Sequence, residues 1–389
     1  MDVEDTTETM SGSENTGATG GELSFACEGE NRQALLNALT AALRATSSRT
    51  SVQVLSGIRI SARPGAIELA ATDMDLSLRT TVAADVRVEG EVLVPGKLFT
   101  DVVRELPPGA AAFTHHDGEG SLAVAAGSYA SRINLYAVED FPRLPATTIP
   151  LHRVPAAALR ETIDRVSRAA SRDESRPVLT GILVRFEGTT LSMAATDSYR
   201  LSLKETELAE AGPSLEAIIP ARALQELTRL AATADEVGLG VSDNHVVFQV
   251  GETWLTTRRI DGTFPDVQKL LPETFRAEVE LPRAELLEAV RRAGLLALRN
   301  TPLRLRFAEG ELTVSAQSQD VGETRETLPV AFTGDALEIG FNADFLRDGL
   351  ESVTGETVRF RLIEPLRPGL LVSESDRFWY LIMPIRLAG

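Results

Sequence analysis

The sequence predicts an α+β protein that repeats one domain three times, with two helices and antiparallel sheets in each repeat. Three observations support this prediction. An amphipathic helix pattern opens each third of the chain, an alternating strand pattern follows it, and a later strand runs into a second helix. Equivalent features recur about 122 to 127 residues apart, and a chain of 389 residues is long enough for three such domains.

The first helix of each third carries apolar residues at helical spacing, which is typical of a helix with one face on a core. The second and third of these helices are predicted to begin with Pro155 and Pro282, which suit a first helical turn. The three apolar stripes are Leu35, Leu39 and Leu43; Leu159, Ile163 and Val166; and Leu286 and Val290 with the pair Leu295 and Leu296.

An alternating run follows each helix, and a period of two indicates a strand with one buried and one exposed face. The three runs are Ile58, Ile60 and Ala62; Ile182, Val184 and Phe186; and Leu303, Leu305 and Phe307.

A strand running into the second helix is predicted at 94–97, 219–222 and 341–344. The first of these resembles a phosphate-binding loop, because Gly90 is followed by Gly96 and Lys97. Five residues separate the glycines where four are needed, and Leu98 stands where a magnesium-binding Ser or Thr belongs. The strand-to-helix interpretation is therefore favoured.

Asp73 and Asp197 follow the same Ala-Thr pair in two different thirds, 124 residues apart. Two carboxylates could in principle cooperate as an acid and a base. Equivalent positions in separate repeats favour the same turn-capping role performed twice.

The formal charge is −17, which argues against a simple basic nucleic-acid binder. Residues 1–22 hold six of the acidic residues and no Lys or Arg, which leaves −11 for the rest of the chain. This Ser-, Thr- and Gly-rich stretch is predicted to be a disordered acidic extension.

The motifs of an enzyme or a metalloprotein are absent from the sequence. Its four histidines lack metal-ligand spacing on a helix, and there is no paired-cysteine element or Gly-x-Ser-x-Gly elbow. We expect no catalytic residue, metal or cofactor.

The single cysteine, Cys27, is expected to be a buried thiol in a cytoplasmic protein. No run of apolar residues is long enough for a membrane span.

Three elements carry a resemblance to a known family. They are residues 195–201, Ala-Thr-Asp-Ser-Tyr-Arg-Leu; Phe264-Pro265-Asp266 with Leu271-Pro272; and the terminal Met-Pro-Ile-Arg-Leu of 383–387. With the three repeats, they resemble the bacterial replicative sliding clamps, the β subunit of DNA polymerase III, over about residues 23–389. The resemblance implies clamp domains at 23–147, 148–272 and 273–389.

The resemblance implies that each chain forms half of a closed homodimeric ring around duplex DNA, with helices lining the hole. It also implies one cleft per chain, where the polymerase III α subunit, the clamp loader and other replication or repair proteins dock through short linear peptides. The implied cleft residues are Leu179, Thr196, Arg200, Leu201, Pro265, Lys269, Leu270, Met383, Pro384, Ile385, Arg386 and Leu387. Ser198 and Tyr199 stand where the family often has Gly and His, which leaves the peptide preference open.

The first helices of the second and third thirds are positively charged. Segments 154–172 and 282–299 each hold four arginines and two acidic residues. Arg165, Arg168 and Arg172 have a spacing that would place them on one helical face. A cationic hole would hold phosphates weakly and read no bases. The family pattern implies that Arg49, Lys97, Arg172 and Arg222 face DNA.

The same pattern implies a dimer interface in which Ile133 and Leu135 of one chain meet Leu295 and Leu296 of the other. The third-domain pair could instead belong to a core.

One alternative function is left open by the sequence, a specialised clamp paralogue that acts as an interaction scaffold or an inhibitor-tolerant spare clamp.

Overall fold

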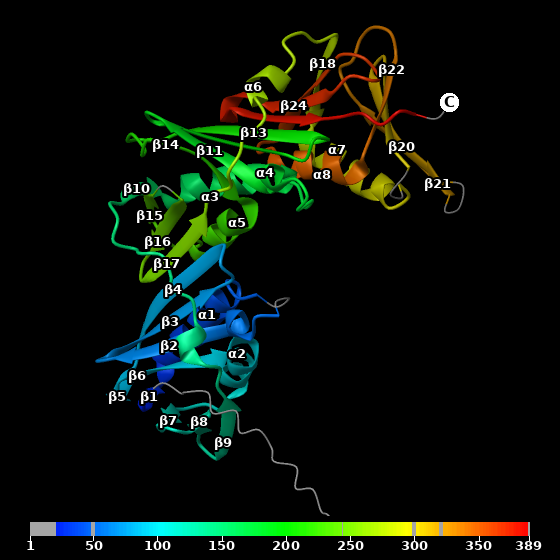
Figure 1. Cartoon of the computed structure of the whole chain (residues 1–389). Helices are drawn as coiled ribbons and strands as arrows, with labels where there is room; N and C mark the ends of the chain where they lie inside the picture. Colours follow the sequence, from blue (N-terminus) through cyan, green and yellow to red (C-terminus); the bar gives the residue numbers. More distant parts are fainter. Residues whose placement is uncertain (1–20, 48–50, 243, 298–300, 319–321, 388–389) are drawn as a thin grey trace, which may run out of the picture. The chain divides into compact units, whose positions relative to one another are not determined.

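The computed structural model describes residues 21–47, 51–242, 244–297, 301–318 and 322–387. The chain divides into two units, Met1–Pro145 and Ala146–Gly389, whose elements follow the chain from blue to red in Figure 1. All but the last two residues of the predicted acidic extension lie outside the described residues, and so does Arg49.

In the described part of the first unit, two α-helices accompany antiparallel strands. One sheet has the order β5-β1-β7-β8-β9, and a second set of strands pairs in the order β4-β3-β2-β6. Helix α1 contacts β3, β4 and helix α2. The bounds are β1 Leu23–Cys27, α1 Gly29–Leu43, η1 Gln53–Ser56, β2 Gly57–Arg63, β3 Ala66–Thr72, β4 Leu76–Ala83, β5 Asp85–Val88, β6 Gly90–Pro95, α2 Gly96–Glu105, β7 Ala111–His115, β8 Ser121–Ala126, β9 Tyr129–Asn134 and η2 Val138–Asp140.

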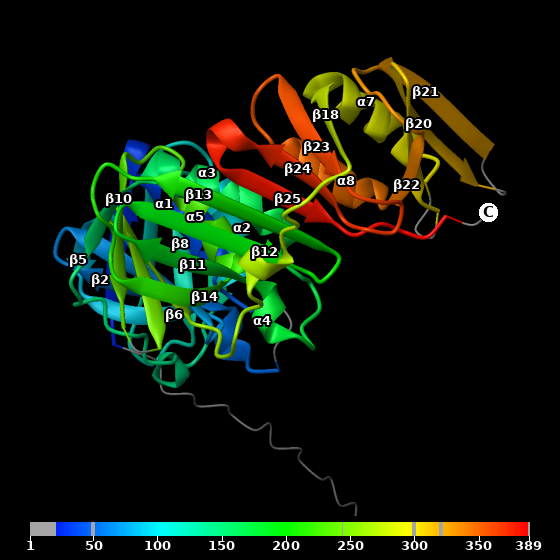
Figure 2. The same ribbon diagram turned by 90° about the horizontal axis from the view of Figure 1, so that it is seen from above.

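In the second unit, one sheet runs through both remaining repeats. Strand β13 (Arg200–Glu207) pairs antiparallel with β25 (Phe378–Ile382), with Leu201 opposite Leu381. The sheet has the order β14-β11-β12-β13-β25-β24-β23-β18. Figure 2 shows β24 and β25 continuing the row of strands that contains β13. The pairing joins the N-terminal half of the unit to the last strand of the chain.

Further strands and helices flank this shared sheet. Strands β10, β15, β16 and β17 pair in that order, and β21-β20-β19-β22 form a separate sheet. Helices α3 and α5 contact each other, as do α7 and α8. The bounds are β10 His152–Pro155, α3 Ala156–Val166, η3 Ser167–Ala169, α4 Pro177–Thr180, β11 Gly181–Glu187, β12 Thr190–Thr196, β14 Leu215–Pro220, α5 Ala221–Leu230, β15 Glu236–Val241, β16 His245–Val250, β17 Thr253–Arg258, α6 Val267–Leu270, β18 Ala277–Pro282, α7 Arg283–Gly294, β19 Leu303–Ala308, β20 Glu311–Ser318, β21 Gly322–Pro329, β22 Leu337–Phe341, α8 Ala343–Ser352, β23 Thr357–Leu362, β24 Gly369–Ser373 and η4 Glu374–Asp376.

The predicted α+β class and the threefold repeat of helices and antiparallel strands are confirmed. Most residues of the predicted helix stripes and all those of the alternating runs are buried. The clearest exception is Leu295, which follows the last residue of α7 and is 79% exposed. The domain boundaries after residues 147 and 272 remain predictions.

The three predicted strand-to-helix junctions are also confirmed. Strand β6 ends at Pro95 and β14 at Pro220, and a helix begins at the next residue in each case. At the third junction Asn342 caps α8, because its side chain accepts a hydrogen bond from the backbone N–H of Phe345 at 3.0 Å. A Cβ atom at Gly96 would lie 2.9 Å from the carbonyl oxygen of Ser56, so this glycine serves packing.

Cys27 is a buried thiol, as predicted, at the end of β1. Burial raises the pKa of the thiol to about 11, because a thiolate would lose its hydration there.

We expect Cys27 in the native chain to react with a thiol reagent at pH 8 on the order of 100-fold more slowly than in the unfolded chain, because little thiolate is present. Mass spectrometry of iodoacetamide-treated samples over time would measure both rates. A variant combining Cys27→Ser with Leu98→Cys moves the thiol to a position that is 52% exposed and should react at the unfolded rate. Fast native labelling of Cys27 would contradict the buried assignment.

No group of three or more His, Cys, Asp or Glu side chains that could hold a metal ion occurs among the described residues. Over the same residues, no helix is both long and apolar enough to cross a bilayer.

Candidate binding sites

The turn between β12 and β13 is built by its own polar side chains. The Oδ1 atom of Asp197 accepts hydrogen bonds from the backbone N–H groups of Tyr199 at 2.9 Å and Arg200 at 3.0 Å. The hydroxyl of Thr196 donates to the carbonyl oxygen of Arg200 at 2.6 Å. Ser198 takes a positive φ of 79°, and the exposed Tyr199 side chain follows it.

The same turn occurs in the first repeat, which confirms the predicted duplication of its capping role. The Oδ1 atom of Asp73 accepts from the backbone N–H groups of Asp75 and Leu76 at 3.1 and 2.8 Å. The two turns differ in one important residue, since Leu76 takes the place of Arg200. The turn geometry alone is therefore not a binding site.

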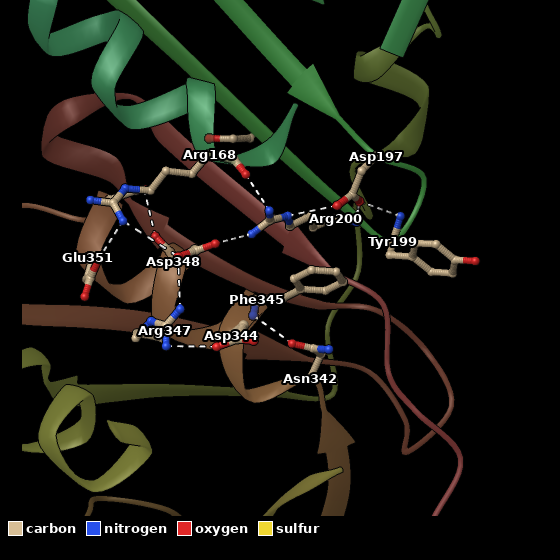
Figure 3. A network of polar contacts seen from close by, with 12 residues as sticks. Arg168, Asp197, Tyr199, Arg200, Asn342, Asp344, Phe345, Arg347, Asp348 and Glu351 are labelled. Atoms are coloured by element: carbon tan, nitrogen blue, oxygen red, sulfur yellow. Dashed lines mark hydrogen bonds and ion pairs between the residues drawn. The ribbon is translucent and has the colours of Figure 1, made fainter. Parts of the chain in front are cut away.

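Arg200 ties the second repeat to the third (Figure 3). Its side chain is only 9% exposed. It contacts the ring of Phe345, with the guanidinium carbon 4.3 Å from the ring centroid, and donates to the backbone carbonyl of Arg168. Its other partners are the carboxylate of Asp197 at 3.0 Å, that of Asp348 at 2.6 Å and the Tyr380 hydroxyl at 3.2 Å.

Tyr380 completes this arrangement from the last strand. Burial raises the pKa of its hydroxyl well above the usual range, so the group remains protonated and donates to the carbonyl oxygen of Phe345 at 2.9 Å. A buried guanidinium is tolerated only where its donors are satisfied. Arg200 therefore acts as a structural link that fixes the turn, and its guanidinium is directed into the protein.

The C-terminal segment lies beside the turn. The backbone N–H of Met383 donates to the carbonyl oxygen of Tyr199 at 2.8 Å. Two residues later, the N–H of Ile385 donates to the carbonyl oxygen of Gly340 at 2.8 Å. Leu387 packs against the same glycine, where an added Cβ would lie 2.5 Å from its Cδ2 atom. The segment thus joins the turn to strand β22.

Apolar residues form a buried base and an exposed rim around the turn. Leu201 is buried in a cluster with Phe264 and Leu381, so it belongs to the core of the shared sheet. Tyr199, Leu270 and Met383 are 61%, 47% and 41% exposed. The remaining predicted cleft residues are partly buried or exposed: Leu179, Pro265, Pro384, Ile385 and Leu387 are partly buried, and Lys269 and Arg386 are exposed.

A polar cavity of about 690 Å³ opens on the same unit, and the sequence did not predict it. Strands β11, β12 and β14 and the segment 259–268 line it, and Pro265 belongs to both the cavity and the predicted cleft. Arg185 and Glu216 form an ion pair at 2.9 Å in its wall.

The predicted helical face of Arg165, Arg168 and Arg172 is wrong. Helix α3 ends at Val166, so Arg172 lies beyond the helix and the following 3-10 turn. Arg165 is buried and pairs with Glu161 at 2.9 Å and with Asp376 at 3.4 Å. Spacing along the sequence predicts a shared face only where the helix continues.

Three of the predicted DNA-facing residues are described and exposed. Lys97 and Arg222 are each the second residue of an equivalent helix, α2 and α5. Arg172 is exposed in the segment after η3.

The predicted interface residues differ in exposure. Ile133 is buried within its own unit, Leu135 and Leu296 are partly buried, and Leu295 is exposed. Strand β9, which carries Ile133, and strand β21 are edge strands of their sheets.

Three α+β repeats, a sheet shared by the last two and a turn tied to the C-terminal segment define a clamp-type fold. The chain matches the DNA polymerase III beta subunit in three parts: the N-terminal domain over residues 23–145, the central domain over 153–266 and the C-terminal domain over 268–386. The chain belongs to this family. The function as a sliding clamp, a non-catalytic processivity factor, is confirmed with it.

Individual proteins that are similar to this chain are sliding clamps as well. The beta sliding clamp of Streptomyces coelicolor is 32% identical over 92% of this chain and 98% of its own length. The solved beta sliding clamp of C. crescentus is 28% identical, covers 94% of this chain and all of its own, and has a TM-score of 0.88. A sliding clamp from Pseudomonas aeruginosa bound to griselimycin is 29% identical, with the same coverage and a TM-score of 0.85.

Proposed function

We propose that two copies of this chain close into a ring around duplex DNA and tether the polymerase III α subunit, the clamp loader and other replication or repair proteins in the cytoplasm. Sliding clamps bind DNA and replication proteins. The observation that supports the tethering function best is the exposed apolar rim of Tyr199, Leu270 and Met383 around a turn that Arg200 holds rigidly.

Peptides would dock at this rim through apolar side chains. Apolar surface with few charges suits short linear segments, and an exposed methionine adapts to several ligands. Leu179, Pro265, Leu270 and Met383 would contact the peptide, with Leu201 beneath them. Thr196 and Arg200 would position the turn, because both are engaged in intramolecular hydrogen bonds. The remaining members of the proposed cleft are Lys269, Pro384, Ile385, Arg386 and Leu387.

The DNA would contact four cationic side chains, those of Arg49, Lys97, Arg172 and Arg222. Long cationic side chains give sequence-independent contacts with phosphates, which suit a protein that slides. The sequence has no series of aromatic residues for stacking on single strands, so duplex is the proposed substrate.

Ring closure would join the first domain of one copy to the third domain of the other. Leu295 offers exposed apolar surface there, and edge strands such as β9 and β21 can pair with a second chain. Because Ile133 is buried in its own unit, it would support the interface mainly from beneath, and Leu135 and Leu296 would contribute their exposed parts.

Retention on DNA tests encirclement directly. After loading by a clamp loader, we expect the chain to remain on nicked circular duplex and to leave linear duplex through its ends, because topology and not affinity holds it. Gel filtration of labelled protein with each DNA measures this. Equal loss from both DNAs would contradict the ring.

The scaffold alternative is tested in a clamp-depleted cell, where a scaffold-only paralogue would not restore replication.

A further inference from the structure

We propose that Glu351 competes with DNA phosphates for two arginines and thereby lowers the affinity of this clamp for the duplex that it encircles. The inference depends on the proposed function, in which Arg172 and Arg222 of the second unit contact DNA. It assigns to one carboxylate of α8 a role in setting how easily the clamp slides.

Glu351 bridges the second and third repeats. Its carboxylate accepts from Arg168, in the turn after α3, at 2.7 Å and from Arg291, on α7, at 2.9 Å. Figure 3 shows Arg168 extending to Glu351 and to the neighbouring Asp348, 3.7 Å away. Helix α8 contacts both α3 and α7, so this carboxylate is positioned to reach an arginine beside each of them.

The exposures of Glu351 and its two arginine partners would allow a DNA phosphate to compete with the carboxylate. Glu351 has only 21% of its side chain exposed, whereas Arg168 and Arg291 have 46% and 47%. About half of each arginine side chain is therefore open to solvent, whereas the carboxylate side chain is mostly covered. The hydrogen bond from Arg291 and the charges of both arginines hold the pKa of Glu351 below its usual range, so it is ionised at neutral pH.

The arginine next to Arg291 in the sequence is also paired with a carboxylate of another element. Arg292 makes two hydrogen bonds to Glu326 of β21, at 3.0 and 2.6 Å. The positive charge predicted for the α7 segment is thus met by carboxylates of other elements and by Glu288 of α7 itself, which accepts from Arg291 at 2.8 Å. A phosphate that contacts Arg168 or Arg291 must share it with Glu351, and the exchange releases fewer counterions than binding to an unpaired cation would.

The matched pair Glu351→Gln and Glu285→Gln tests the proposal in the full-length protein. Each removes one negative charge from a helix of the third repeat, and glutamine can still accept one hydrogen bond from an arginine. Glu285 is exposed in the first turn of α7. Fluorescence anisotropy with a short linear duplex over a range of salt concentrations gives the affinity and its salt dependence.

We expect Glu351→Gln to steepen the slope of log K against log salt by about 1, because Arg168 loses its 2.7 Å partner while Arg291 keeps its bond to Glu288. Affinity at low salt should rise about 10-fold or more. Glu285→Gln should change the slope by much less. The gain should disappear when Arg168→Gln and Arg291→Gln are added to the Glu351→Gln variant.

An unchanged slope in Glu351→Gln, an equal effect of Glu285→Gln, or a gain that survives loss of both arginines would overturn the proposal. Circular dichroism and gel filtration of each variant show whether it is folded. The nicked-circle experiment on the unaltered chain separates the two ideas. Retention there with no effect of Glu351→Gln refutes this inference alone, whereas failure of retention refutes the ring.

Discussion

Replacing Arg200 with methionine is expected to lower the free energy of unfolding of the 146–389 unit by about 3 kcal/mol. The substitution keeps an apolar side chain near Phe345 but leaves Asp197 and Asp348 without their buried cation. Breaking a buried ion pair on one side is costly because the remaining charge stays desolvated. Asp348 keeps weaker contacts with Arg168 and Arg347 at 3.7 and 3.9 Å, so the effect should lie at the lower end of the range for such pairs.

Urea denaturation followed by tryptophan fluorescence measures this change, because both tryptophans, Trp254 and Trp379, lie in this unit. Arg185→Met is the matched control. Arg185 pairs with Glu216 at 2.9 Å on the same sheet, but both side chains are largely exposed, so its loss should cost less than about 1 kcal/mol. Arg200→Lys should fall between the two, since one ammonium cannot reach all the partners of a guanidinium. Equal losses for Arg200→Met and Arg185→Met would refute the structural role of Arg200.

Features determined by short stretches of sequence were predictable. The helix stripes, the alternating strands and the strand-to-helix junctions follow from periodicity, and the two Asp-capped turns follow from the repeated Ala-Thr-Asp segment. Leu201 shows the limit of this approach. Alternation identifies it as a strand residue, but only the pairing of β13 with β25 shows that its side chain lies beneath the rim.

Contacts between distant segments were not predictable. Asp348 and Tyr380 lie 148 and 180 residues from Arg200, and no local pattern connects them. For the same reason the sequence predicted cationic helices without the carboxylates that neutralise them, such as Glu351 for Arg168 and Arg291. The burial of Arg165 was not predicted, because its partner Asp376 follows it by 211 residues. Charge summed over a segment is therefore a poor guide to the charge that a ligand meets.

The second large effect is expected at the rim. Met383→Glu should raise the Kd for a peptide taken from the polymerase α subunit at least about 30-fold, which corresponds to about 2 kcal/mol. A carboxylate there would have to be desolvated against apolar partners when the peptide docks. Because the backbone N–H of Met383, and not its side chain, bonds to Tyr199, the turn should keep its geometry. Fluorescence anisotropy of the labelled peptide on full-length protein measures the change.

Met74→Glu is the matched control, because Met74 is 57% exposed and has a positive φ of 82° in the equivalent turn of the first repeat. Met74→Glu should leave peptide affinity unchanged.

Removing residues 383–389 should abolish stimulation of the polymerase and leave the dimer intact. The deletion also removes the bond from Ile385 to Gly340 at the edge of β22, so the point substitution isolates the rim itself. Wild-type peptide affinity in Met383→Glu, or dissociation of the dimer in the deletion, would show that the assignment of this segment to the cleft is wrong.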